Sequence, residues 1–99
     1  MEKGGAVYIV TNKSHSVLYI GVASDLFTRI QQHREHFYKK SFSDRYNTEK
    51  LIYYELSGSI EEAIVREKEI KKWRRAKKEA LINKMNPEWK DLWEKVKEW

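Results

Sequence analysis

A helix beginning near Ser24 or Asp25 is expected to carry two polar side chains on the face turned toward the core. Three apolar residues at helical spacing mark that face: Leu26, Ile30 and Phe37. Arg29 and His33 project into the same face, because each residue of an α-helix turns by about 100°. A covered face is normally apolar throughout. An arginine and a histidine four residues apart there indicate a cleft in which charge is needed.

A second helix, expected over residues 59–73, places a carboxylate among apolar residues. Ser59 and Glu62 have the spacing of a capping box. The inward stripe of this helix consists of Ile60, Ala63 and Ile70. Glu67 projects into the middle of the stripe, where a carboxylate needs an ion pair, a proton or a metal ion. An ion pair with Arg29 and a catalytic role are the two interpretations, and the pattern favours neither.

Two β-branched and aromatic segments joined by a short turn predict an antiparallel hairpin: residues 6–12 and 17–22, with the turn over 13–16. The hairpin register places Val10 opposite Tyr19 and Tyr8 opposite Gly21. Tyr8 and Tyr19 then share a face as diagonal neighbours. Gly21 leaves a space beside the Tyr8 ring that any larger side chain would fill.

A polar and aromatic stretch over residues 38–50 predicts a surface loop. Its basic and aromatic residues could contact a nucleic-acid backbone. A solvated loop anchored by Phe42 or Tyr46 is the favoured alternative. A third strand is expected over residues 51–56, and Gly58 ends it before the second helix.

The C-terminal part is predicted to form a helical extension over residues 76–99, which begins with a short helix through Leu81 and Ile82. Asn86 is expected to cap a last helix with Pro87 as its first residue. Five residues follow helical spacing there: Trp89, Leu92, Trp93, Val96 and Trp99. This stripe favours a lid over the core or a self-association surface over a base-stacking platform.

Length and composition indicate one folded domain with a small core. The chain has 99 residues, of which 40% are hydrophobic and 35% charged, and it contains no cysteine. Disulfides, thiolate zinc sites and cysteine nucleophiles are therefore excluded. Neither a membrane span nor a signal peptide is recognisable, so a cytoplasmic location is expected.

The charge balance points to a polyanionic partner. The net charge is +5 and the isoelectric point is near 9.4, with basic residues concentrated over 66–84. Charge alone is weak support, because lysine-rich helices are more often solvated faces than nucleic-acid surfaces.

Taken together, these residues resemble the GIY-YIG nuclease family over nearly the whole chain. The two halves of the family name correspond to residues 6–8 and 19–21, where the first triad reads AVY in place of GIY. Arg29 in DLFTRIQQH matches the helix arginine of the family, and His33 follows one turn later. Glu67 in EEAIVREKEIKKW matches the metal-binding glutamate. The small stand-alone bacterial members, whose sequences also run on to a segment like NPEW, are the most similar.

The resemblance implies an α+β fold, a three-stranded antiparallel sheet flanked by helices, and hydrolysis of DNA phosphodiesters with one divalent metal ion. Glu67 would hold Mg²⁺ or Mn²⁺, and Arg29 would brace the phosphate. Tyr8 would act as the base toward the attacking water. Tyr19 would orient water or phosphate, and His33 would serve as a second base or a phosphate ligand.

The proposed base requires a lowered pKa. The ordinary pKa of tyrosine is near 10, so Tyr8 needs positive charge close by. Arg29, the metal ion and Lys72, which follows Glu67 at a familiar spacing, are the expected sources of that charge.

The function implied is that of a metal-dependent DNA endonuclease in repair or recombination. With no attached DNA-binding domain in this sequence, branched, nicked or single-stranded DNA is expected in place of a specific duplex sequence. Six basic residues are expected to bind its phosphates: Lys71, Lys72, Arg74, Arg75, Lys77 and Lys78. The alternatives are a non-catalytic nucleic-acid-binding module and a protein-interaction domain that uses the tryptophan-bearing C-terminal helix. Each predicts a monomer or a weak dimer.

Overall fold

Three antiparallel strands form the centre of the computed structural model, which describes residues 4–35 and 48–98. The strands are β1 (Gly5–Thr11), β2 (Leu18–Ala23) and β3 (Lys50–Ser57), in the spatial order β2-β1-β3. The helices are α1 (Leu26–Arg34), α3 (Ile60–Lys71), α4 (Arg75–Met85) and the short α5 (Trp93–Val96). The predicted α+β fold is therefore confirmed. Several residues of the sequence predictions lie outside the described residues: Phe37, Phe42, Tyr46 and Trp99.

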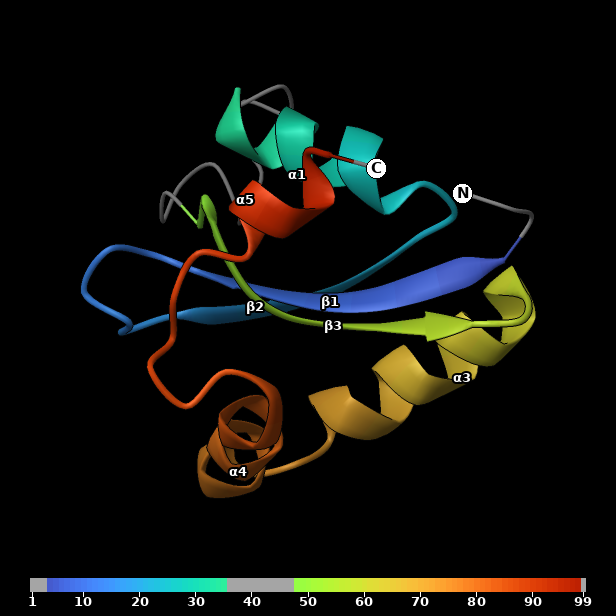
Figure 1. Ribbon diagram of the computed structural model, residues 1–99. Coiled ribbons are helices and arrows are strands. Elements are labelled where there is room, and N and C mark those ends of the chain that lie inside the picture. Colours follow the sequence, from blue (N-terminus) through green and yellow to red (C-terminus); the bar gives the residue numbers. More distant parts are fainter. Residues whose placement is uncertain (1–3, 36–47, 99) are drawn as a thin grey trace.

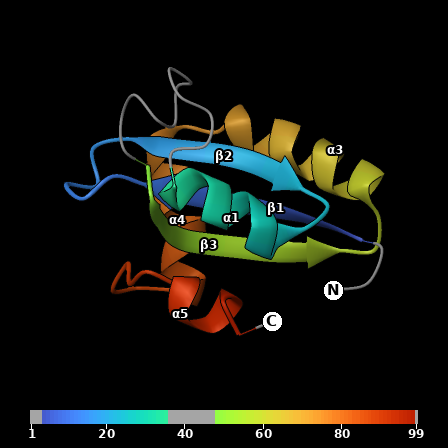
Figure 2. The same ribbon diagram turned by 90° about the horizontal axis from the view of Figure 1, so that it is seen from above.

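The helices cover the sheet from both sides (Figure 1). α1 and α5 lie on one face, and α3 and α4 on the other. Viewed from above, α1 lies over the sheet while α3 runs alongside β2 (Figure 2). Every residue of the central strand β1 is buried, and its side chains alternate between the two cores, with Tyr8 on the α1 face and Ile9 on the α3 face.

The predicted hairpin register is confirmed. Tyr8 pairs with Gly21, and Val10 pairs with Tyr19. The turn contains no glycine. Instead, Asn12 Oδ1 accepts hydrogen bonds from two backbone N–H groups of the turn region, those of Ser16 and Val17. The asparagine side chain thus binds two N–H groups of the turn, and His15 takes the left-handed conformation, with φ 60°, that glycine often supplies in turns.

The expected starts of the first two helices are also confirmed. Asp25 caps α1 by accepting a hydrogen bond from the Thr28 backbone N–H, and Ser59 caps α3 by accepting one from Glu62. The Glu62 carboxylate in turn accepts from the Gly58 backbone N–H at 3.2 Å. α3 ends at Lys71, two residues before the expected end.

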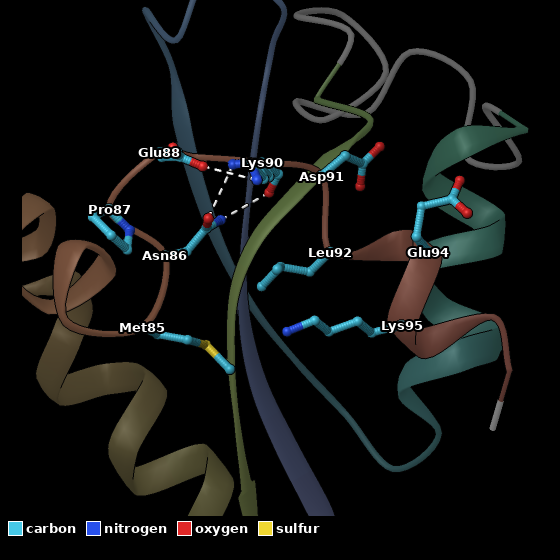
Figure 3. A pocket seen from close by; sticks show the side chains of 9 residues that line it. All are labelled: Met85, Asn86, Pro87, Glu88, Lys90, Asp91, Leu92, Glu94 and Lys95. Carbon is cyan, nitrogen blue, oxygen red and sulfur yellow. Dashed lines mark hydrogen bonds and ion pairs between the residues drawn. The ribbon is translucent and has the colours of Figure 1, made fainter.

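The expected helix start at Asn86 is wrong. Asn86 ends α4 and is buried, and its side-chain Nδ2 donates to the carbonyl of Ile52 at 3.0 Å. Its amide also exchanges hydrogen bonds with the Lys90 backbone (Figure 3). The strand pairing shifts register between Ile9 and Val10, and the extra β3 residue is Ile52. The carbonyl at this bulge needs a partner, and that need outweighs the tendency of Asn-Pro to open a helix.

The expected stripe of tryptophans on the last helix is not found either, because the helix does not begin at residue 87. Only Trp93–Val96 form the last helix, and Trp89 lies before it with a positive φ of 53°. Trp89 packs against the core on the α3 face, whereas Trp93 packs against the core on the α1 face. Within the described residues, the segment therefore contributes to both cores, and Trp89 and Trp93 do not form one continuous aromatic surface.

Gly21 is expected to be irreplaceable for a steric reason. A Cβ atom at this position would overlap the hydroxyl oxygen and the Cζ of Tyr8. We expect Gly21→Ala to displace the Tyr8 ring and to lower the free energy of unfolding by about 1–3 kcal/mol. Urea denaturation measures this change. Gly58→Ala is the matched control, because the nearest atom there is the flexible Glu62 Oε2 at 3.4 Å. Equal stability of the two variants would contradict the close approach of Tyr8.

Candidate active site

Three of the predicted site residues form a compact aromatic cluster on the α1 face. The ring centroids of Tyr8 and Tyr19 lie 6.5 Å apart, and the His33 imidazole lies 5.5 Å from each of them in an edge-on orientation. The three residues come from β1, β2 and α1. The sequence prediction that these side chains converge is thus met by the geometry.

The Tyr8 hydroxyl is buried and is hydrogen bonded to His33 Nε2 at 2.9 Å. Burial raises the pKa of Tyr8 well above its usual value, and the neighbouring Tyr19 adds to this. The charge and hydrogen bonding of the Arg29 guanidinium act in the opposite direction, but they do not offset burial. Arg29 alone therefore does not lower the pKa of Tyr8 below its usual value, and the side chain is a neutral phenol at pH 7.

His33 is neutral as well. Burial, followed by the positive charge of Arg29, lowers the pKa of His33 to about 4. A neutral imidazole has one ring nitrogen free to accept a proton. In the tautomer protonated at Nδ1, the Tyr8 hydroxyl donates to Nε2, which gives a phenol and a proton acceptor in direct contact.

The charge of Glu67 acts on this cluster from a helix on the other face of the sheet. α3 packs mainly on β1 and β2, and the negative charge of Glu67 contributes to the raised pKa of Tyr8. The Glu67 side chain is only 14% exposed, and its Oε2 lies 3.4 Å from the Nζ of Lys71. Of the two interpretations of Glu67, the ion pair with Arg29 is not found among the described residues, because the carboxylate pairs with a lysine on its own helix.

The Glu67 carboxylate fits a divalent cation. It is largely covered by protein, yet its one ion pair is with a half-exposed lysine that can move away. Mg²⁺ is commonly held by one or two carboxylates, with water and substrate phosphate completing the coordination. Within residues 4–35 and 48–98, no group of three or more His, Asp or Glu side chains is arranged to hold a metal. Glu67 would thus hold the ion without a preformed cluster of three protein ligands in that part of the chain.

The six basic residues predicted to bind phosphates differ in their surroundings. Lys71 already belongs to the ion pair with Glu67. Arg75 pairs with Glu79 at 2.8 Å, and Lys77 Nζ lies 4.2 Å from the centre of a tryptophan ring, that of Trp73. Three have no such side-chain contact within the described part of the chain: Lys72, Arg74 and Lys78.

The sequence analysis missed two contacts near the predicted site residues, one of Glu67 and one at the end of α1. Lys71 follows Glu67 by four residues, a helical spacing that signals an ion pair. Asp91 bonds to Arg34 at the end of α1, and nothing in the local sequence indicates a contact over 57 residues.

Comparison with known proteins identifies the class of domain to which this α+β fold belongs, a nuclease-type domain. The family model that describes the GIY-YIG catalytic domain matches residues 4–86 of this chain. A UPF0213 protein of Syntrophus aciditrophicus (strain SB) is 35% identical over 82 residues, which cover 83% of this chain and 92% of that protein. No solved structure matches the chain significantly.

The chain therefore belongs to the GIY-YIG family. This membership implies a nuclease-type function with DNA as the substrate, and GIY-YIG nucleases generally depend on a divalent metal ion. None of the helices in the described part of the chain has the length and hydropathy needed to cross a membrane.

We expect His33 to titrate near pH 4, well below the ordinary 6.5. Between these values the unfolded chain binds the proton at residue 33 more readily than the folded one, so the free energy of unfolding falls as the pH falls through this window. NMR titration of the imidazole Cε1 signal measures the pKa, and His33→Gln assigns the signal. A pKa near 6.5 would mean that the ring is solvated and does not bond to Tyr8.

Proposed function

We propose that this protein is a cytoplasmic, metal-dependent DNA endonuclease that hydrolyses phosphodiester bonds during repair or recombination. The observation that carries the proposal is the hydrogen bond between the Tyr8 hydroxyl and a neutral His33. A buried phenol in contact with a proton acceptor, flanked by an arginine and a carboxylate, meets the needs of phosphoryl transfer.

The paired side chains provide a route for the proton of the attacking water. Water gives its proton to the Tyr8 oxygen while the Tyr8 hydroxyl proton passes to His33 Nε2. No phenolate has to form beforehand, so the raised pKa of Tyr8 does not block the reaction. The resulting imidazolium returns its proton to solvent after the bond has broken.

The other residues would act on the phosphate. The planar guanidinium of Arg29 would bind two phosphate oxygens and stabilise the charge that develops there. Tyr19 would orient the water or the phosphate by hydrogen bonding. Glu67 would hold Mg²⁺ or Mn²⁺ through a carboxylate oxygen. The bound ion would supply further charge stabilisation to the phosphate and the leaving oxygen.

The basic surface favours recognition of the DNA backbone without a sequence code. Lys72 caps the end of α3 one turn after Glu67, and Arg74 directly precedes α4. With Lys78 they provide ammonium and guanidinium groups that no other side chain in the described part of the chain already uses. Phosphate contacts of this kind position DNA but carry no sequence information, which favours branched, nicked or single-stranded substrates.

The second candidate is a nucleic-acid-binding module of the same fold without turnover. The observation that favours it is the raised pKa of Tyr8, which keeps the proposed base protonated. This module would bind DNA with an affinity that falls steeply with salt, but would not cut it.

A cleavage assay with Glu67→Gln tests the metal assignment. We expect the wild type to cut at least one of a panel of single-stranded, nicked, flapped and branched DNAs in Mg²⁺ or Mn²⁺. The amide cannot replace the carboxylate charge, so we expect the rate of Glu67→Gln to fall by about 100-fold or more. Glu61→Gln, on an exposed residue of the same helix, is the control. Undiminished cutting by Glu67→Gln would refute the metal site, and binding without any cutting would favour the second candidate.

Tyr8→Phe tests the proton route. Only the hydroxyl is lost, so the fold should remain, with a stability loss of about 1–2 kcal/mol. The single-turnover cleavage rate should fall by about 100-fold. Tyr53→Phe is the matched control, because the Tyr53 hydroxyl donates to Glu55 away from the site. If both variants cut DNA at the wild-type rate, the Tyr8 hydroxyl is outside the proton route.

A further inference from the structure

Asp91 ties three parts of the molecule together. Its Oδ1 accepts hydrogen bonds from the backbone N–H of Leu51 on β3 at 3.2 Å and from that of Trp93 at 3.0 Å. Its Oδ2 accepts from Arg34 Nη1 at 2.8 Å. Figure 3 shows Asp91 on the chain between α4 and α5, beside β3. One carboxylate thus links the sheet edge, the start of α5 and the end of α1.

Trp93 extends this link along α1. The Trp93 ring stacks on the Phe27 ring, with centroids 5.3 Å apart and an angle of 29° between the planes. The Arg34 guanidinium carbon lies 5.3 Å from the Trp93 centroid. Phe27 belongs to the first turn of α1 and Arg34 is its last residue, so the C-terminal segment contacts both ends of this helix.

The helix held in this way carries half of the candidate site. Arg29 and His33 both lie between Phe27 and Arg34 on α1. α1 has nine residues and buries only Leu26 and Ile30, a size at which an isolated helix is not stable. Its position must come from tertiary contacts, and those with α5 are prominent among them.

We propose that the segment around Asp91 and Trp93 is a positioning element for the active site, which sets the orientation of Arg29 and His33 through the ion pair between Asp91 and Arg34. The segment lies beyond residues 4–86, the part of the chain that matches the family's catalytic domain. This inference rests on the proposed function for its catalytic consequence, but its structural consequence stands alone.

The charge of Asp91 is the part of this link that can be removed cleanly. In Asp91→Asn the Oδ1 acceptor for Leu51 and Trp93 is kept, while an NH₂ group replaces the oxygen that faces Arg34. Arg34→Met removes the same ion pair from the helix side and keeps an apolar stem against Trp93. Neither variant substitutes Arg29 or His33, so an effect on the site must come from a change in the position of α1.

The test combines NMR with kinetics. We expect both variants to shift the imidazole signals of His33 while the backbone amide signals of α3 and α4 stay unchanged. The kcat for DNA cleavage should fall by about tenfold, with KM within about twofold of wild type, because small displacements of catalytic groups cost rate more than binding. Glu94→Gln is the matched control: it removes a carboxylate from α5 that pairs with Lys97 and has no ion pair with α1.

The outcomes separate the two proposals. A lower melting temperature in Asp91→Asn, with wild-type His33 signals and wild-type kcat, would reduce the link to a stabilising contact and overturn the inference. Equal effects from Glu94→Gln would overturn it as well. If the wild type cuts no DNA, the proposed function fails, and the His33 signals alone decide whether Asp91 positions α1.

Discussion

The burial of one hydroxyl group constrains much of this structure. Tyr8 belongs to the central strand and is fully buried, so its hydroxyl must find a partner inside the protein or lose hydrogen-bonding energy on folding. His33 is that partner, and its position requires α1 to lie on the Tyr8 face of the sheet. Gly21 supplies the room in which the Tyr8 ring lies. A packing requirement and a candidate catalytic contact are therefore the same interaction.

The surrounding charges are arranged so that none is cancelled within the site. Arg29 acts on the pKa values of both Tyr8 and His33, and Glu67 acts on Tyr8. Within the described residues the salt bridge of Glu67 goes to Lys71, outside the aromatic cluster. A direct pair between Arg29 and Glu67 would have satisfied each charge and left little for an external ligand. With this geometry, the guanidinium remains directed to the site, and the carboxylate is held by a lysine that a cation can replace.

The sequence predicted those features that depend on short-range patterns. Hairpin register follows from strand alternation, and the caps at Asp25 and Ser59 follow from residue types next to an apolar stripe. The convergence of the tyrosines with Glu67 depends on how separate elements pack, and it was predicted through the family resemblance. The division of the chain at residue 76 stays a prediction.

The expected helix start at Asn86 fails for a physical reason. Asn-Pro is a strong local signal for a helix start, which is why the sequence predicts one at Asn86. The Asn86 side chain instead donates a hydrogen bond to the carbonyl of Ile52, at a bulge 34 residues away. Local preferences amount to about 1 kcal/mol, comparable with the cost of leaving a buried carbonyl unpaired, so tertiary demand decides such cases.

The region where local patterns failed is also the region that holds α1. A helix of nine residues is too short to be stable by itself, so contacts with the rest of the protein must hold it. Its two fully buried side chains define where it touches the sheet, but not the angle between the helix axis and the strands. Contacts at both of its ends, at Phe27 and at Arg34, define that angle. The irregular path of the segment before α5 places Asp91 and Trp93 at these two points. A regular helix from residue 87 would have directed its tryptophans by helical spacing alone, so the departure from the expected helix is what allows the C-terminal segment to orient Arg29 and His33.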